Sequence, residues 1–263
     1  MVFVSGHFGE WLQGTVGAEG TVALVTLACP SAGASAELCG AGPLIIRQSV
    51  PLLDLDRCRE FLTVLGLPAM GKVHLWADLP PGGGAGMSTA SLVALARAAG
   101  AEEERIAEAC LRVEGATDPL MLARPDCVLW APRAACVLMQ LPPPPDSEIL
   151  GGLWGAPIRT DAKDIVFPDI LDLVSAWALA PNLVEAARLA SVSAERTTSL
   201  RGPQSDPTPF LARRIGALGH ARAHTGSARA LIFSPGTIPA TAEAELIEAG
   251  YTHLIRFRTG GRT

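Results

Sequence analysis

The chain is poor in charged and aromatic residues. Charged residues make up 18% of its 263 positions and aromatic residues 5%, with a single tyrosine, whereas hydrophobic residues make up 49%. A composition this apolar excludes disorder over most of the chain. Alanine, leucine and valine carry the apolar content, which is typical of helices packed on a sheet. The length is enough for two modest domains or one large one.

The chain also lacks a positive charge excess, a long apolar run and paired cysteines. A net charge of −5 argues against nucleic-acid binding. No run approaches the roughly 18 apolar residues of a membrane span, and the N-terminus MVFVSGHFGE lacks the basic and apolar regions of a signal peptide. None of the six cysteines forms a CxxC pair. We therefore expect a cytoplasmic protein with reduced thiols and no membrane partner.

The first half alternates strand and helix patterns. Residues 72–79 show the period of a half-buried strand, and residues 54–65 carry apolar side chains at helical spacing. The glycine-punctuated segment 6–20 is interpreted as a loop or hairpin. Strands are predicted at residues 2–4, 21–29, 44–49, 72–79, 127–130 and 135–140, and helices at 54–65, 88–99 and 102–114.

Four consecutive prolines at residues 142–145 mark a predicted domain boundary, because such a run fits neither a helix interior nor a central strand. The prediction is an N-terminal domain over 1–145 and a C-terminal domain over 146–263. The end of the second domain predicts a helix–strand–strand–helix–strand order, which suggests a ferredoxin-like α+β fold. Arg258–Thr263 is expected to be a disordered tail. In this half, strands are predicted at 149–154, 220–224, 228–233 and 253–257, and helices at 170–178, 182–195, 210–218 and 240–249.

The sharpest motif is PPGGGAGMSTA at residues 80–90, between a predicted strand and a predicted helix. Its four glycines let backbone N–H groups approach an anion without a Cβ in the way. The following helix would add unpaired N–H groups and a positive dipole end, and Ser88 or Thr89 could give a hydroxyl to magnesium. The motif predicts phosphate binding; a flexible loop ending in a helix N-cap is the alternative.

A second glycine motif is rejected. Gly66–Lys72 fits the GxxxxGK pattern of a P-loop, but Val73 stands where a hydroxyl is needed, and the segment leads into a strand rather than a helix.

Three other groups of polar residues are candidates for chemistry. Glu114 and Asp118 in EGATD, just past a predicted helix end, could hold magnesium and accept a hydroxyl proton; the alternative is a solvated Glu114 and an Asp118 that stabilises a turn. The segment GHFGEWLQG mixes glycines with His7, Glu10 and Gln13 and could present these polar groups to a ligand. His220 and His224 are four apart, but their stretch is predicted as a strand, so structural roles are favoured over zinc binding.

The order of these motifs resembles the GHMP kinase superfamily. Within it, the chain is most similar to the L-threonine kinases of cobalamin synthesis and propanediol utilisation. The matching segments are GEWLQG at 9–14, the glycine loop, EGATD at 114–118 and HTGS at 224–227, and residues 151–164 resemble the segment that opens the family's C-terminal domain. The resemblance implies a two-domain α+β fold, with an N-terminal α/β domain that contains a left-handed βαβ unit and a ferredoxin-like C-terminal domain.

The resemblance also implies a function and residue roles. It implies an ATP- and magnesium-dependent kinase that phosphorylates a small amino acid, L-threonine, to O-phospho-L-threonine for cobalamin synthesis. Asp118 would be the catalytic base or orient the hydroxyl, and Ser88 and Glu114 would bind magnesium. ATP phosphates would lie against Pro80, Gly82, Gly83, Gly84, Ala85, Gly86, Met87, Ser88 and Thr89, and the substrate against Glu10, Gln13, His224, Thr225, Gly226 and Ser227.

The chain departs from the family pattern at three places. Met87 stands where many members have serine, EGATD has one residue more than EPTD and lacks the following serine, and Thr225 replaces the serine of HSG. The longer acidic turn leaves Glu108 as an alternative magnesium ligand. The remaining alternatives are a homoserine kinase or another small-molecule kinase of the superfamily, a nucleotide-binding protein without catalysis, and a purely structural domain. The fold permits a homodimer.

Overall fold

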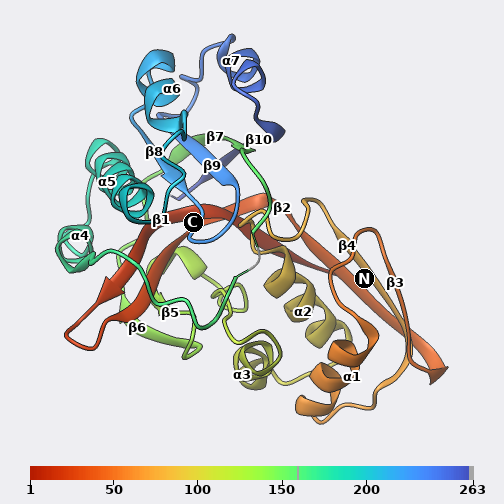
Figure 1. Cartoon of the computed structure of the whole chain (residues 1–263). Coiled ribbons are helices and arrows are strands. Elements are labelled where there is room, and N and C mark those ends of the chain that lie inside the picture. Colours follow the sequence, from red (N-terminus) through yellow and green to blue (C-terminus); the bar gives the residue numbers. More distant parts are fainter. Residues whose placement is uncertain (159, 261–263) are drawn as a thin grey trace.

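The computed structural model describes residues 1–158 and 160–260 of the chain. Two long antiparallel strands, β1 (Val2–Val16) and β2 (Thr21–Pro43), cross the middle of the molecule as the red-to-orange band of Figure 1. They belong to a ten-stranded sheet whose main path runs β10-β7-β9-β8-β1-β2-β4-β3, with the hairpin β5–β6 attached to β2. The other strands are β3 (Ile45–Gln48), β4 (Met70–Ala77), β5 (Val128–Ala131), β6 (Cys136–Gln140), β7 (Ser147–Leu153), β8 (Gly219–Arg222), β9 (Ala228–Phe233) and β10 (Thr252–Thr259).

Helices pack in groups against this sheet. In the first half, α1, α2 and α3 lie together on one side, and in the second half α4 and α5 lie apart from α6 and α7 (Figure 1). The helices are α1 (Leu55–Val64), α2 (Met87–Ala98), α3 (Glu103–Glu114), α4 (Leu171–Trp177), α5 (Leu183–Arg201), α6 (Thr208–Ile215) and α7 (Ala242–Glu248), with a 3-10 turn at Pro125–Cys127. Within the described residues, none of these helices has both the length and the apolarity needed to cross a membrane.

The mixed α+β architecture agrees with the sequence prediction. In the first half, β3 and β4 are parallel neighbours joined through α1, which makes a βαβ unit. In the second half, the antiparallel order β10-β7-β9-β8 is the four-strand order of a ferredoxin-like sheet. The predicted division at residue 145 falls in the link between β6 and β7. One buried cluster nevertheless includes residues of both halves, from Val4 to Phe257.

Two sequence expectations are wrong. Residues 6–14 form the middle of β1 rather than a loop, with pairing irregularities between Ser5 and Gly6 and again on either side of Glu10. The hairpin alternative holds for residues 17–20, which form the turn between β1 and the antiparallel β2. Small residues serve close packing here: a Cβ at position 14 would lie 2.2 Å from the carbonyl oxygen of Pro168. The expected disordered tail is also partly strand, because Arg258 and Thr259 pair with β7; residues 261–263 lie outside the described range.

Candidate functional site

The glycine loop connects β4 to α2 and lies against the turn that follows β8. Gly84 has a φ of +77°, and a Cβ there would stand 2.3 Å from the Cβ of Ala223 and 2.5 Å from the carbonyl oxygen of Thr225. The amide of Ala228 donates to the carbonyl of Gly83 at 2.7 Å, and that of Gly9 donates to Gly84 at 3.3 Å. Any larger residue would push the loop off these neighbours, so the sequence requires glycine for this approach.

The start of α2 is open to an anion. Gly86, in the left-handed region at φ +70°, is the N-cap, and among the described residues no side chain caps the helix. Backbone N–H groups in the first turn of a helix have no intrahelical acceptor and carry the positive end of the dipole. The side chain of Met87 is buried, and its methyl group lies against Gly6 of β1. The missing hydroxyl at 87 is therefore replaced by a core contact.

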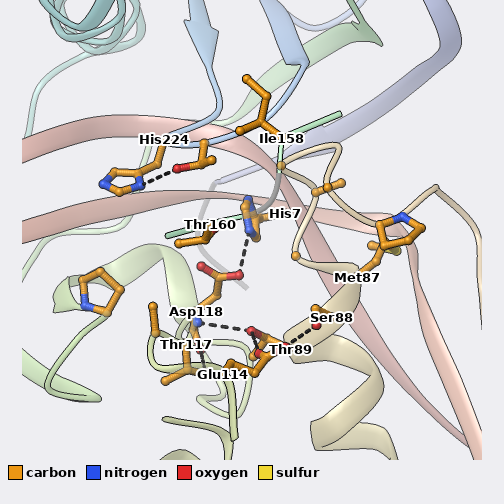
Figure 2. Close-up of a pocket in the computed structure, with 18 of the residues that line it drawn as sticks. His7, Met87, Ser88, Thr89, Glu114, Thr117, Asp118, Ile158, Thr160 and His224 are labelled. Carbon is orange, nitrogen blue, oxygen red and sulfur yellow. Dashed lines mark hydrogen bonds and ion pairs between the residues drawn. The ribbon is translucent and has the colours of Figure 1, made fainter. Parts of the chain in front are cut away.

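A carboxyl at the end of α3 joins the two hydroxyls of α2. Ser88 Oγ donates to Glu114 Oε1 in a short hydrogen bond, and Thr89 Oγ1 donates to Glu114 Oε2 at 3.2 Å. Burial raises the pKa of Glu114 to about 7, although the Ser88 hydroxyl and the nearby Arg57 guanidinium favour its charged form. Glu108, the alternative from the sequence, is exposed on α3 and does not line the cavity. Figure 2 shows Glu114 beside Ser88 and Thr89.

Four residues further along, Asp118 has a different partner. Gly115 ends α3 in the left-handed conformation, and the chain turns so that Asp118 meets β1. His7 Nε2 lies 3.1 Å from Asp118 Oδ2, and the backbone amide of Asp118 lies 3.4 Å from Thr89 Oγ1 (Figure 2). Burial opposes ionisation of Asp118, but the His7 imidazole, by charge and by hydrogen bond, holds the pKa of this carboxyl below its usual value.

The other side of His7 faces Glu10. Nδ1 of His7 lies 3.3 Å from the carbonyl oxygen of Gly9 and 3.5 Å from Glu10 Oε1. Burial alone would lower the pKa of His7, yet Glu10 and Asp118 raise it to about 9. Burial raises the pKa of Glu10 to about 8, and its Oε2 has no hydrogen-bond partner among the described residues. His7 is thus a buried cation between two carboxyl groups.

These groups open into one cavity of about 290 Å³. Its remaining wall comes from the β5–β6 turn, the segment after β7 and the turn after β8, which contribute Arg133, Ile158, Thr160, His224 and Thr225. Arg133 donates through Nη2 to the carbonyl of Asp164, but its Nε and Nη1 are buried without a partner among the described residues. The Phe167 ring stacks on His224 at 4.0 Å between centroids. Burial lowers the pKa of His224 to about 3.

Most of the site residues predicted from the sequence meet in this cavity. Glu10, Glu114, Asp118, His224 and Thr225 line it together with the loop residues Pro80, Gly82, Gly84, Ala85, Gly86, Met87, Ser88 and Thr89. Four predicted residues lie outside its described lining: Gln13, Gly83, Gly226 and Ser227.

The residues outside the lining support the fold around it. The Gln13 amide donates to the carbonyl of Arg222 at 2.9 Å, so it joins β1 to β8. A Cβ on Gly226 would lie 2.6 Å from the nitrogen of Gly84, which makes this glycine a packing partner of the loop. Of the two histidines four apart, His220 lies on β8 and His224 in the turn that follows it; among the described residues no cluster of three or more His, Cys, Asp or Glu side chains that could hold a metal ion is found.

Sequence reasoning named His7 among the polar groups of the GHFGE segment but assigned it no role, and it missed Arg133. Arg133 occupies an ordinary turn. What places it is the bond from the amide of Thr117 to the carbonyl of Pro132, 2.8 Å, which holds the turn against the acidic segment.

The donor set fits ATP and magnesium. Magnesium is usually bound through one or two protein oxygens plus phosphates and water, rather than by a full protein cage. Ser88 and Glu114 supply one hydroxyl and one carboxylate beside the glycine loop. The loop runs directly into the uncapped start of α2, and such a backbone cradle before a helix suits phosphate.

The structure is similar to solved small-molecule kinases, while no protein-family model and no curated protein sequence matches the chain. Mevalonate kinase of L. major, in complex with R-mevalonate, superposes with a TM-score of 0.67 at 13% identity, covering 98% of this chain and 94% of that one. The mevalonate kinase of Methanococcus jannaschii gives 0.62 at 11% identity, covering 100% and 98%. A putative homoserine kinase from Listeria monocytogenes gives 0.58 at 13% identity, covering 99% and 98%. The chain therefore has the mixed α+β fold of GHMP kinases.

Proposed function

We propose that the protein is an ATP- and magnesium-dependent kinase that phosphorylates the hydroxyl group of a small amino acid, with L-threonine as the acceptor. The observation that carries this proposal is that a glycine cradle, a hydroxyl–carboxyl pair and a separate ionised carboxylate open into one cavity. Phosphoryl transfer relies on positioning and charge neutralisation, and these three elements supply both. The similarity to mevalonate and homoserine kinases agrees with this chemistry.

Each element has a distinct part in the reaction. The loop N–H groups and the start of α2 would bind the phosphates, and Ser88 and Glu114 would hold magnesium, which supplies neutralisation of phosphate charge when bound. The acceptor oxygen forms a bond to the γ-phosphorus while the bond from that phosphorus to the β–γ bridging oxygen breaks and ADP leaves. Asp118 orients the acceptor hydroxyl and takes its proton.

A carboxylate on the acceptor is favoured by Arg133. Two of its nitrogens are buried without partners in the described part of the chain, and its guanidinium lines the cavity. An unpaired buried donor costs free energy, which an incoming carboxylate would offset by accepting a charge-assisted hydrogen bond from one of these nitrogens. The same chemistry suits L-homoserine, so the preference for L-threonine rests on the sequence resemblance. Its product would be O-phospho-L-threonine, and a cytoplasmic location, where ATP and free amino acids occur, fits this function.

The test is a panel of acceptors. Purified protein with ATP and Mg²⁺ is given L-threonine, L-serine, L-homoserine, R-mevalonate or L-threoninol, in which the carboxylate is reduced. ADP release and ³¹P NMR of the product are measured. We expect the highest kcat/KM with L-threonine and almost none with L-threoninol. Preference for R-mevalonate or for L-threoninol would contradict the amino-acid assignment. ATP-induced thermal stabilisation without turnover on any acceptor would indicate a binding protein instead.

A further inference from the structure

A buried arginine stands behind the turn on which the glycine loop packs. We propose that Arg229, the second residue of β9, is a positioning residue for ATP: held by Asp206, its guanidinium fixes the turn at residues 224–228 against the phosphate loop. The inference rests on the proposed kinase function. It extends that function to a pair of residues outside the motifs of the family resemblance and outside the described lining of the cavity.

The turn after β8 meets the glycine loop through its backbone. The amide of Ala228 donates to the carbonyl oxygen of Gly83 at 2.7 Å. A Cβ on Gly226 would lie 2.6 Å from the nitrogen of Gly84, and a Cβ on Gly84 would lie 2.5 Å from the carbonyl oxygen of Thr225. Because closely packed backbones transmit a displacement, any shift of the turn moves the loop with it.

Arg229 holds this turn from the other side. Its Nη1 donates to the carbonyl oxygen of Gly226 at 3.2 Å and to that of Ala228 at 3.0 Å. These are two of the residues whose backbones contact the loop. The guanidinium therefore fixes, from inside the C-terminal half, the part of the turn that sets the position of the loop.

Asp206 in turn fixes the arginine. Its Oδ2 accepts from Arg229 Nε at 2.5 Å, and each of the two side chains is only 3% exposed. Its Oδ1 accepts from the amide of Thr208 at 3.0 Å and from the Thr208 hydroxyl, which lies 2.5 Å from the Tyr251 hydroxyl. Burial opposes ionisation of Asp206, but the Arg229 charge and the Thr208 hydroxyl hold the pKa of this carboxyl below its usual value. Arg229 is thus held in one orientation by a buried carboxylate.

A second buried arginine lies at the start of the turn. Arg222 stands directly opposite Arg229 in the β8–β9 ladder, and burial, followed by the Arg229 charge, lowers the pKa of Arg222 to about 10. Its Nη1 donates to Thr198 Oγ1 at 2.7 Å and to the carbonyl oxygen of Gly202 at 3.0 Å. Like charges at opposed positions cost a sheet stability. In return, both ends of the turn are fixed to one segment, residues 198–206.

A purely structural ion pair is the competing explanation. It predicts that loss of the pair lowers the Tm and leaves the nucleotide affinity of the folded protein unchanged. A positioning role predicts weaker ATP binding, because part of the binding free energy is then used to order the loop. The acceptor should be affected less, since Arg133 and Asp118 reach the cavity from other segments.

The deciding experiment removes both charges together, because a single substitution would leave an unpaired charge in the core. The double variant Arg229→Met, Asp206→Leu replaces the pair by apolar side chains, a change that can leave stability nearly intact. Binding of a non-hydrolysable ATP analogue with Mg²⁺ is measured by calorimetry, and initial rates are measured with ATP and L-threonine varied in turn. We expect the Kd for the analogue and the KM for ATP to rise roughly tenfold. The KM for L-threonine should change by less than about twofold.

The matched control is Tyr251→Phe, which removes a buried hydroxyl at the far end of the same hydrogen-bonded network, beside Thr208. It should lower the Tm and leave the Kd for the analogue at the wild-type value. A double variant with wild-type Kd and wild-type KM for ATP would overturn the inference. An equal rise of the Kd in Tyr251→Phe would also overturn it, because the effect would then follow from lost stability.

A conservative variant keeps the test decisive if the double variant folds poorly. Arg229→Lys retains a charge beside Asp206, but an ammonium lacks the planar fork that reaches a carboxylate and two carbonyl groups together. We expect a rise of about threefold in the Kd for the analogue, and an unchanged Kd would overturn the inference. A wild type that binds the analogue but transfers no phosphate to any acceptor would instead contradict the proposed kinase function, while the Kd values would still decide the role of Arg229.

Discussion

Glu114 and Asp118 lie four residues apart on the same side of one cavity, yet their surroundings give them opposite properties. Glu114 is buried against two hydroxyls, and its pKa is raised to about 7. Asp118 is buried against an imidazolium, and its pKa is lowered. A carboxyl that accepts from two hydroxyls, with the Arg57 guanidinium 3.7 Å away, suits an incoming metal ion, whereas one hydrogen-bonded directly to an imidazolium remains ionised and suits a hydroxyl. The environment, rather than the residue type, separates the two roles.

The largest effect is expected from removing the charge of Asp118. Asp118→Asn preserves shape but cannot take a proton, so we expect kcat to fall by about 10³, while thermal stabilisation by an ATP analogue persists. Asp172→Asn, which removes an exposed carboxylate on α4, is the control. An Asp118→Asn enzyme with wild-type kcat would remove the distinction between the two carboxyl groups.

The next effect concerns the other carboxyl. Glu114→Gln should lower the rate at low magnesium by roughly 10 to 100-fold and recover partly as magnesium is raised, since one of two protein oxygens for the ion becomes neutral. Titration of activity against Mg²⁺ measures this. Glu108→Gln, an exposed change on the same helix, should have no effect. A shared defect in both variants would contradict the assignment to Glu114.

A smaller effect is expected at the acceptor. Arg133→Gln should raise the KM for L-threonine about tenfold, because the acceptor carboxylate loses a charged hydrogen-bond donor, with the KM for ATP unchanged. Initial rates with each substrate varied in turn provide the measurement. Arg188→Gln, an exposed residue of α5 paired with Glu185, serves as the control. An increase in the KM for ATP alone would place Arg133 on the nucleotide side.

The smallest expected effect concerns how the thermal stability of the protein changes with pH. The folded-state pKa of His7 is raised to about 9, so the stability that His7 contributes is fully present below pH 6.5 and is lost as the pH rises through 9. The folded-state pKa of His224 is lowered to about 3, so the stability that His224 contributes is lost as the pH falls from 6.5 towards 3. The Tm should therefore peak between these arms.

Variants separate the two arms. His7→Gln should flatten the alkaline arm and His224→Gln the acidic one, each by a few degrees when Tm is followed by calorimetry. Identical pH curves for both variants would show that the two histidines are in equivalent environments, contrary to their contacts.

Much of the fold followed from periodicity. The ferredoxin-like half was predicted because its helices and strands keep their own apolar spacing. The length of β1 was not predicted, because Gly6, Gly9 and Gly14 taken alone indicate turns. In the folded chain they allow close approach of other backbones, as at Gly14 and Pro168. Such contacts join residues far apart in sequence, and local pattern does not encode them.

The same distinction applies to the site: its contiguous motifs could be predicted from the sequence, and its contacts between distant segments could not. The glycine loop and its hydroxyls are contiguous, so their chemistry was visible in the sequence. His7 and Arg133 gain their meaning from one contact each, to Asp118 and to the segment around Asp164. Both contacts cross between separate elements. Gln13 shows the reverse: its place in a motif suggested substrate binding, but its amide joins two strands.

That link between β1 and β8 has a consequence for how the protein is made. Gln13 and the carbonyl it binds are 209 residues apart in the chain, and Glu10 is paired in register with the same residue, Arg222. On the ribosome, β1 must therefore wait for some 209 further residues before this neighbour exists. Such distant pairing slows folding. The cavity is expected to form only after Arg222 has been synthesised, and a nascent chain would acquire its chemistry no earlier than that.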